Sequence, residues 1–226
     1  RNLSPGVAAL SAGASDMSGW LLLGLPGYMY SSGVVSIWIA LGLTIGAFAN
    51  YLLVAPRLRV YTEIADNAIT LPDYFANRFE DKSHLLRVIS AIVIILFFTV
   101  YTAASLAGGG KLFDSALGMS YSTGLWVTAG VVVIYTLFGG FLAVSTTDFV
   151  QGVIMLLAMI IVPLVAFTDL GGVGATTTAI RNIDPEMLNI FSGMTFLGIL
   201  SLLAWGLGYF GQPHIIVRFM AIRSVK

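Results

Sequence analysis

The sequence predicts an all-α integral membrane protein, on the strength of its composition, its long apolar segments and the distribution of its basic residues. The chain has 226 residues, of which 58% are hydrophobic and 10% are charged, whereas soluble domains carry about 25% charged residues. Its mean hydropathy is +0.92. The net charge is zero and cysteine is absent. Nothing in the composition therefore indicates a nucleic-acid partner, a disulfide framework or a thiolate metal site.

Six segments are long and apolar enough to cross a bilayer, which takes about 20 residues of helix. A shorter amphipathic helix at about 71–80 is expected at the membrane interface, because Thr70-Leu71-Pro72-Asp73 is typical of a helix start and apolar residues follow at helical spacing. The six spans are expected at about 7–29, 33–55, 88–107, 122–143, 149–168 and 188–211.

The basic residues indicate how these spans are oriented. With six crossings, only Lys111 and Arg181 fall on one side of the membrane. Lysine and arginine are enriched in cytoplasmic loops, so the side that holds both chain ends is expected to be cytoplasmic. That side carries nine of the eleven basic residues: Arg1, Arg57, Arg59, Arg78, Lys82, Arg87, Arg218, Arg223 and Lys226.

Asp16 is the most informative residue of the chain, because it is the only charged residue in the apolar stretch 2–29. A charge at mid-membrane costs about 2.5–3.5 kcal/mol on insertion scales. The serines and glycines around it propagate helices poorly, which predicts a broken helix with freed carbonyls. One interpretation is that Asp16 forms a hydrogen bond with a neighbouring helix and only stabilises the bundle. The other is that it belongs to a cation site, together with backbone carbonyls and serine hydroxyls.

A second interruption is expected in the sixth span, where three glycines and Pro213 occur between Trp205 and His214. Close helix packing is one explanation, and a broken helix is the other, with Trp205 and Tyr209 on one face. Two breaks that lie five helices apart favour a five-plus-five inverted repeat. The first repeat would be 1–168 and the second would begin within 188–226.

Four further positions are less decisive. Asp148 ends the short turn Gly139–Asp148 and either caps the fifth span or gives a departing cation an acidic stopping point. Tyr101 lies mid-membrane, where it either packs or meets a polar solute. His84 and His214 have no second ligand nearby, so we expect no transition-metal site, and no catalytic motif indicates an enzyme.

The chain resembles the sodium:solute symporter family, and within it the proline-carrying members. The resemblance covers nearly the whole chain and rests on four segments in order: Ser11–Trp20, Thr70–Phe75, Gly139–Val144 and Trp205–His214. It implies a leucine-transporter-like fold, truncated after the sixth helix of the repeat, in an internal piece of a longer protein.

The resemblance also implies the roles of particular residues. Sodium would bind Asp16, Ser18 and the backbone carbonyls of Ala14 and Met17. Asp148 would lie on the sodium release path. The residues implied to bind or gate the solute are Ser18, Gly19, Trp20, Tyr101, Trp205, Tyr209 and Pro213.

The expected function is sodium-coupled uptake of L-proline across the bacterial inner membrane by alternating access, without an organic cofactor. The partners would be sodium, L-proline and the lipid bilayer. Three alternatives remain open: a symporter of this family for another small solute, a transporter-like sensor module of a signalling protein, and an ion channel. The residues alone do not separate sodium from a proton, because a carboxylate binds either.

Overall fold

The computed structural model describes residues 3–223, and these form helices, turns and one isolated bridge between Leu3 and Ile222. The chain divides into two compact units. The first consists of Arg1–Gly19, Ala55–Phe149 and Pro213–Lys226, and the second of Trp20–Val54 and Val150–Gln212. The backbone therefore leaves one unit for the other after Gly19, Val54, Phe149 and Gln212.

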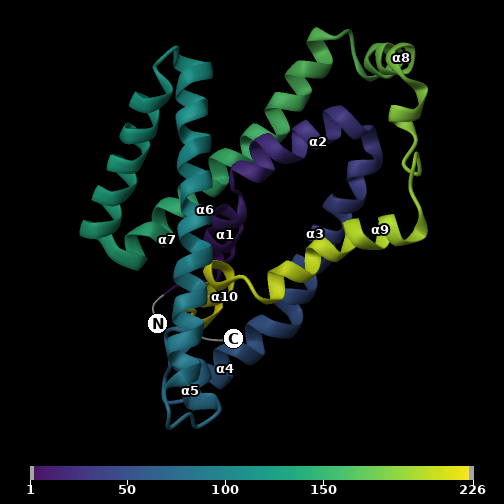
Figure 1. Cartoon of the computed structure of the whole chain (residues 1–226). Coiled ribbons are helices and arrows are strands. Elements are labelled where there is room, and N and C mark those ends of the chain that lie inside the picture. Colours follow the sequence, from purple (N-terminus) through teal and green to yellow (C-terminus); the bar gives the residue numbers. More distant parts are fainter. Residues whose placement is uncertain (1–2, 224–226) are drawn as a thin grey trace. The chain divides into compact units, whose positions relative to one another are not determined.

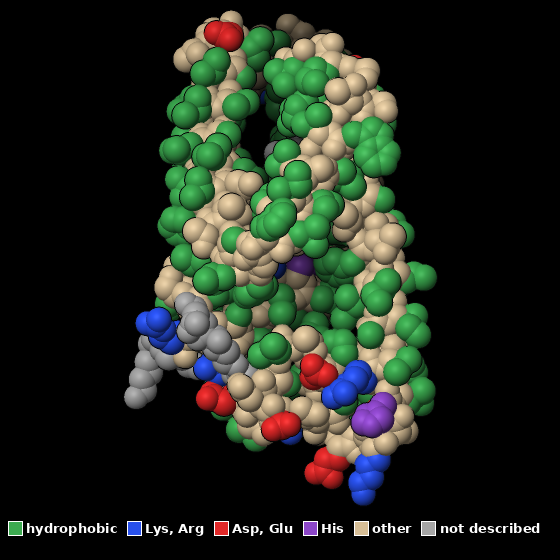
Figure 2. All heavy atoms as spheres, turned by 90° about the vertical axis from the view of Figure 1, so that its left-hand side faces the viewer, with side chains coloured by type: hydrophobic (Ala, Val, Ile, Leu, Met, Phe, Trp, Pro, Cys, Tyr) green, Lys and Arg blue, Asp and Glu red, His purple; other side chains and the backbone are tan. Residues whose placement is uncertain are grey.

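Three described helical stretches are long and apolar enough to cross a membrane: Leu25–Ile64, Leu85–Leu117 and Tyr121–Asp169. A shorter apolar helix, Phe196–Phe210, accompanies them. Most large hydrophobic side chains of Leu85–Leu117 and Tyr121–Asp169 are exposed, as expected for helices that face lipid. In Figure 2, hydrophobic side chains cover most of the visible face, whereas charged side chains gather mainly at its lower end.

In the first unit, a group of short helices packs together beside a long one. Helix α10 contacts both α1 and α4, and α5 lies against α6 (Figure 1). The side chains of Ile215, Phe219 and Met220 are buried on α10. The helices are α1 (Pro5–Asp16), α4 (Ala55–Ile64), α5 (Leu71–Arg78), α6 (Leu85–Leu117), the first part of α7 (Tyr121–Asp169) and α10 (Pro213–Met220).

In the second unit, α3 (Ile37–Ala49) packs along both α9 (Phe196–Leu203) and the 3₁₀-helix η5 (Ala204–Phe210). Figure 1 shows α3 and α9 side by side. The remaining elements are η1 (Trp20–Gly24), α2 (Leu25–Ser32), η2 (Gly33–Ser36), η3 (Asn50–Val54), the rest of α7, α8 (Val173–Ile183) and η4 (Pro185–Leu188).

The helix boundaries differ from the expected ones in two informative places. The turn expected at Gly139–Asp148 is helical except at Gly140, whose φ of 57° and ψ of −162° bend α7. Glycine adopts this conformation at low cost. Ser145 and Thr146 lie within the helix, and their hydroxyls donate to carbonyls four residues earlier. Such bonds satisfy polar side chains within an apolar helix.

The shorter apolar helix begins at Phe196, whereas the sixth span expected from the sequence began at about 188. The Thr195 side chain accepts a hydrogen bond from the Gly198 N–H at 3.1 Å and so caps the helix. The preceding residues 189–195 form turns and extended backbone. A threonine cap satisfies one of the donors that a helix start leaves free, which fixes the start at this residue.

Candidate ion and solute sites

The first expected interruption is present at residues 17–19. Helix α1 ends at Asp16, Met17 leaves the helical region with φ −70° and ψ 83°, and the chain resumes as the π-helix η1 at Trp20. The Met17 N–H still donates to the Gly13 carbonyl at 3.2 Å. Short π-helical turns are frequent at functional sites.

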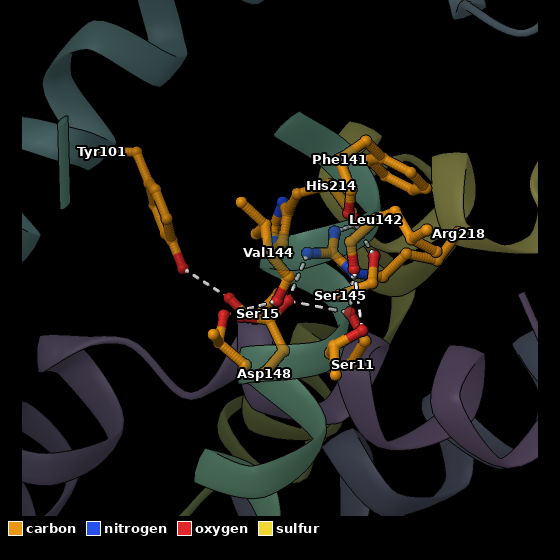
Figure 3. A network of polar contacts seen from close by, with 12 residues as sticks. Ser11, Ser15, Tyr101, Phe141, Leu142, Val144, Ser145, Asp148, His214 and Arg218 are labelled. Atoms are coloured by element: carbon orange, nitrogen blue, oxygen red, sulfur yellow. Dashed lines mark hydrogen bonds and ion pairs between the residues drawn. The ribbon is translucent and has the colours of Figure 1, made fainter. Parts of the chain in front are cut away.

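A helix end leaves its last carbonyls without intrahelical donors, and here Tyr101 supplies one of the missing donors. Tyr101 lies on α6, and its hydroxyl donates to the Ser15 carbonyl oxygen at 3.1 Å (Figure 3). Gly19 lies near the same helix, since a Cβ on it would be 3.8 Å from the Ala104 carbonyl oxygen. The structure therefore joins Tyr101 to the interrupted segment through the backbone of that segment.

A buried ion pair lies beside this interruption (Figure 3). Arg218 Nη2 is 2.8 Å from Asp148 Oδ2. Ser11 and Ser15 donate to the same carboxylate oxygen at 2.8 and 3.2 Å. Arg218 also donates from Nε to Ser11 Oγ at 2.6 Å and from Nη1 to the His214 carbonyl. This charge cluster, Ser11, Ser15, Asp148 and Arg218, combines α1, α7 and α10.

The cluster changes the interpretation of Asp148. The residue lies eight positions beyond the bend at Gly140, inside helical backbone, so it does not cap the fifth span. Only 8% of Asp148 and 7% of Arg218 is exposed. Two opposite charges buried together with further hydrogen bonds are tolerated, whereas either one left alone is strongly destabilising.

The second interruption has a different structure. Residues 204–210 form the 3₁₀-helix η5, which is long for this type, and the α-helix resumes at Pro213. The indole of Trp205 stacks on that of Trp20, with ring centroids 5.1 Å apart and planes 17° apart. The structure thus brings together two of the aromatic residues that the family resemblance implies for the solute.

Glycines let the backbone of η5 come into direct contact with the backbone of α3. A Cβ on Gly42 would overlap the backbone of Leu203, and one on Gly46 would overlap that of Gly206. At the end of this contact the Asn50 side chain donates from Nδ2 to the Tyr209 carbonyl at 3.0 Å. From the sequence, close helix packing and a broken helix were alternative explanations for these glycines. Gly206 takes part in both, because it lies in η5 and packs against α3.

His214 lies among aromatic residues in the first unit. Its ring centroid is 5.3 Å from that of Phe98 and 5.4 Å from that of Tyr101. Its two ring nitrogens are buried without a hydrogen-bond partner in the described chain. Among residues 3–223 no group of three or more His, Cys, Asp or Glu side chains could hold a metal ion.

Sequence reasoning missed three residues: Ser11, Asn50 and Arg218. Ser11 and Asn50 are fully buried polar side chains in apolar helices, and Arg218 interrupts the apolar run 215–220. Each therefore carried a detectable signal, because a polar residue inside an apolar segment needs a partner. The sequence could not supply the partner, which lies more than 60 residues away in each case.

Comparison with known proteins identifies relatives along the whole chain. The high-affinity proline transporter PutP of Bacillus subtilis (strain 168) is 64% identical over 226 residues, which are all of this chain and 48% of the relative. The osmoregulated proline transporter OpuE of the same organism is 60% identical over the whole chain and 46% of its own length. The sodium/proline symporter of Staphylococcus aureus is 58% identical, with 44% of its length covered.

The chain thus spans slightly less than half the length of these curated relatives. No solved structure matches it significantly. The family model described as "Sodium:solute symporter family" matches residues 1–226, and this family consists of transporters, not of enzymes. Because this family model matches the whole chain, and because the chain has long apolar helices, the chain belongs to the sodium:solute symporter family.

Proposed function

We propose that the full-length protein couples the entry of sodium to the uptake of L-proline by alternating access. The observation that carries this proposal is the identity of 58–64%, along all of this chain, with three transporters whose names specify proline. One of those names also specifies sodium. Each positive charge that moves inward gains about 2.3 kcal/mol per 100 mV of membrane potential, and this gain would drive solute accumulation.

The ion site of this proposal is the interruption after α1. Sodium would bind the Asp16 carboxylate, the Ser18 hydroxyl and the carbonyls of Ala14 and Met17. Hard cations prefer several oxygen ligands, and a helix that ends at Asp16 presents carbonyls in its last turn. The hydrogen bond from Tyr101 to the Ser15 carbonyl supports this assignment, because it fixes the backbone between Ala14 and Asp16.

The solute would contact residues of both interruptions: Ser18, Gly19, Trp20, Tyr101, Trp205, Tyr209 and Pro213. The stacking of Trp20 on Trp205 supports a role for this pair in enclosing an apolar ring. Proline is small and carries both charges of an amino acid, so a site for it needs apolar walls and a few polar groups.

Asp148 would act on the sodium release path only when its partner is displaced. In this structure the carboxylate is neutralised by Arg218 and bonded by Ser11 and Ser15. A sodium ion that reaches Asp148 would compete with the guanidinium for the same oxygen. The proposal therefore requires the charge cluster to open during each cycle.

The wider architecture is proposed on the same grounds. A leucine-transporter-like arrangement would place residues 1–168 in a first five-helix repeat and begin a second, inverted repeat within 188–226. The basic residues favour a cytoplasmic location for both ends of this chain, in the inner membrane of a bacterium. Interruptions in the first and the sixth expected spans are typical of such repeats.

The test is sodium-dependent proline uptake by the full-length protein with Asp16→Asn and Asp16→Glu. The asparagine variant is expected to raise the sodium concentration for half-maximal uptake by about tenfold or more, because it removes a charge-assisted contact. Asp114→Asn is the matched control, since this carboxylate is on α6 in an exposed pair with Lys111. Normal sodium dependence in Asp16→Asn would contradict the ion site.

Competition by other solutes tests the proline assignment separately. Unlabelled proline should displace labelled proline from uptake, whereas other amino acids, sugars and vitamins should do so only at much higher concentration. If another solute competes better, the protein is a symporter of the same family with a different substrate. Sodium currents without proline would instead indicate a channel.

A further inference from the structure

We propose that Gly24 is a positioning residue for the solute site, because the missing side chain at this position leaves the space in which the indole of Trp20 lies. This inference rests on the proposed function, in which Trp20 and Trp205 contact or gate the solute. It adds a residue that acts through Trp20 and does not itself touch the solute.

The indole of Trp20 occupies the place that a side chain on Gly24 would take. Gly24 is the last residue of the π-helical turn η1, which begins at Trp20. A Cβ on Gly24 would overlap Cδ2, Cε3 and Cζ3 of Trp20, and these are the three heavy atoms nearest to it. All three belong to the six-membered ring of the indole. Any side chain at residue 24 therefore requires this ring to move.

The backbone conformation of Gly24 does not explain why the residue is glycine. Its φ of −71° and ψ of −48° lie in the right-handed helical region, which every L-residue adopts. In helical backbone glycine is less favourable than alanine, because it loses more conformational freedom on folding. What glycine provides here is room for the neighbouring ring.

The space beside Gly24 matters because Trp20 is not enclosed by a core within the described chain. The exposed fraction is 42% for Trp20 and 46% for Trp205, so surrounding side chains leave much of both rings uncovered. The two indoles nonetheless stack nearly parallel, with centroids 5.1 Å apart. Such stacking depends on ring offset and angle. An indole displaced from Gly24 would lose this geometry.

Gly27 provides an internal comparison. It lies three residues further along, within α2, and no heavy atom lies within 4 Å of a Cβ placed on it. Both glycines follow the first interruption within about two helical turns, but only Gly24 lies under an aromatic ring. Gly27→Ala is therefore the matched control for Gly24→Ala.

The first experiment measures uptake kinetics of the full-length protein with Gly24→Ala. Loss of the indole stacking is expected to raise the KM for proline by about fivefold. The sodium concentration for half-maximal uptake at saturating proline should change by less than about twofold. Gly27→Ala should keep the wild-type KM. A purely structural role of Gly24 would instead lower the amount of protein in the membrane and leave the KM unchanged.

The second experiment does not depend on transport. It compares the midpoint of thermal unfolding of the purified full-length variants. Gly24→Ala should lower the midpoint, because the added Cβ forces the ring aside. In a Trp20→Ala background the same substitution should no longer lower it, since the ring is absent. If Gly24→Ala alone does not reach the membrane, the double variant should be as abundant as Trp20→Ala.

Three results would overturn the inference: an unchanged KM for proline in Gly24→Ala, an equal rise of the KM in Gly27→Ala, or a defect of Gly24→Ala that persists without the Trp20 ring. Failure of the proposed function is distinct from these. In that case the wild-type protein itself would lack sodium-dependent proline uptake, while the effects on thermal unfolding would remain.

Discussion

The two helix interruptions of this chain are stabilised by different chemistry. Beside the first, at residues 17–19, serine hydroxyls of α1 donate to the carboxylate of a buried ion pair. At the second, η5, glycine backbones pack against α3 and one neutral amide bonds a carbonyl. The first interruption is thus stabilised by charged and hydroxyl groups, and the second by close backbone packing. This difference is what we expect if the proposed ion site lies at the first interruption and a wall of the proposed solute site at the second.

The largest expected effect tests the charged side of this comparison. Arg218→Gln removes the cation that neutralises Asp148 and should lower the free energy of unfolding by about 3–5 kcal/mol. Adding Asp148→Asn should recover part of this loss, because no charge is then left buried alone. Thermal unfolding of the purified full-length protein measures both.

Lys111→Gln is the control for the loss of an ion pair at the surface. Its pair with Asp114 is exposed, with 63% and 44% of the side chains accessible, so the cost should be about 0–1 kcal/mol. Equal effects of Arg218→Gln and Lys111→Gln would show that the buried pair is not held as a unit, and would remove the contrast between the interruptions.

A smaller effect tests the neutral side. Gly46→Ala and Gly206→Ala each place a Cβ against backbone of the opposite helix, and overpacking of this kind costs about 1–3 kcal/mol. We expect lower thermal stability together with reduced proline uptake. Gly130→Ala is the control, since no heavy atom lies within 4 Å of its added Cβ. Unchanged stability in both variants would contradict the close contact.

The smallest effect concerns Asp81, a partly exposed carboxylate that belongs to neither interruption. Asp81 accepts hydrogen bonds from the Leu86 N–H at 2.7 Å and the Ser83 N–H at 3.0 Å. Its bond from the Ser83 hydroxyl is the main cause that lowers the pKa of Asp81 below its ordinary value. These hydrogen bonds should therefore persist at any pH above the ordinary pKa of an aspartate, and they should be lost as the pH falls below about 4 and the carboxylate is protonated.

Amide hydrogen exchange measures this loss. The Leu86 amide should exchange faster, relative to its intrinsic rate, as the pH falls through that window and in Asp81→Ala at neutral pH. Glu80→Ala is the control on the neighbouring carboxylate. Protection of Leu86 that is independent of both pH and Asp81 would show that this start of α6 does not depend on the carboxylate.

The sequence predicted what depends on local chemistry. Serine and glycine around Asp16 indicated the break after α1, and three glycines with Pro213 indicated η5. The Thr70 cap and Pro72 marked the start of α5, which begins at Leu71. These features depend on residues within one or two turns, where propensity and capping act.

What the sequence did not predict depends on distant partners or on backbone freedom. The pairing of Asp148 with Arg218 and that of Asn50 with Tyr209 need the folded chain. The bend of α7 falls at Gly140, within the turn expected at Gly139–Asp148, but the rest of that segment is helical and its hydroxyls bond carbonyls of the same helix. The expected turn was therefore too long.

The central proposal is that the first interruption binds the ion, and that binding of the solute, which contacts both interruptions, depends chiefly on the second. Its most direct test is one set of initial uptake rates over a grid of sodium and proline concentrations, with Asp16→Asn and Trp205→Ala in the full-length protein. We predict that Asp16→Asn shifts chiefly the sodium dependence and Trp205→Ala chiefly the proline dependence. A wild-type sodium dependence in Asp16→Asn would contradict the account.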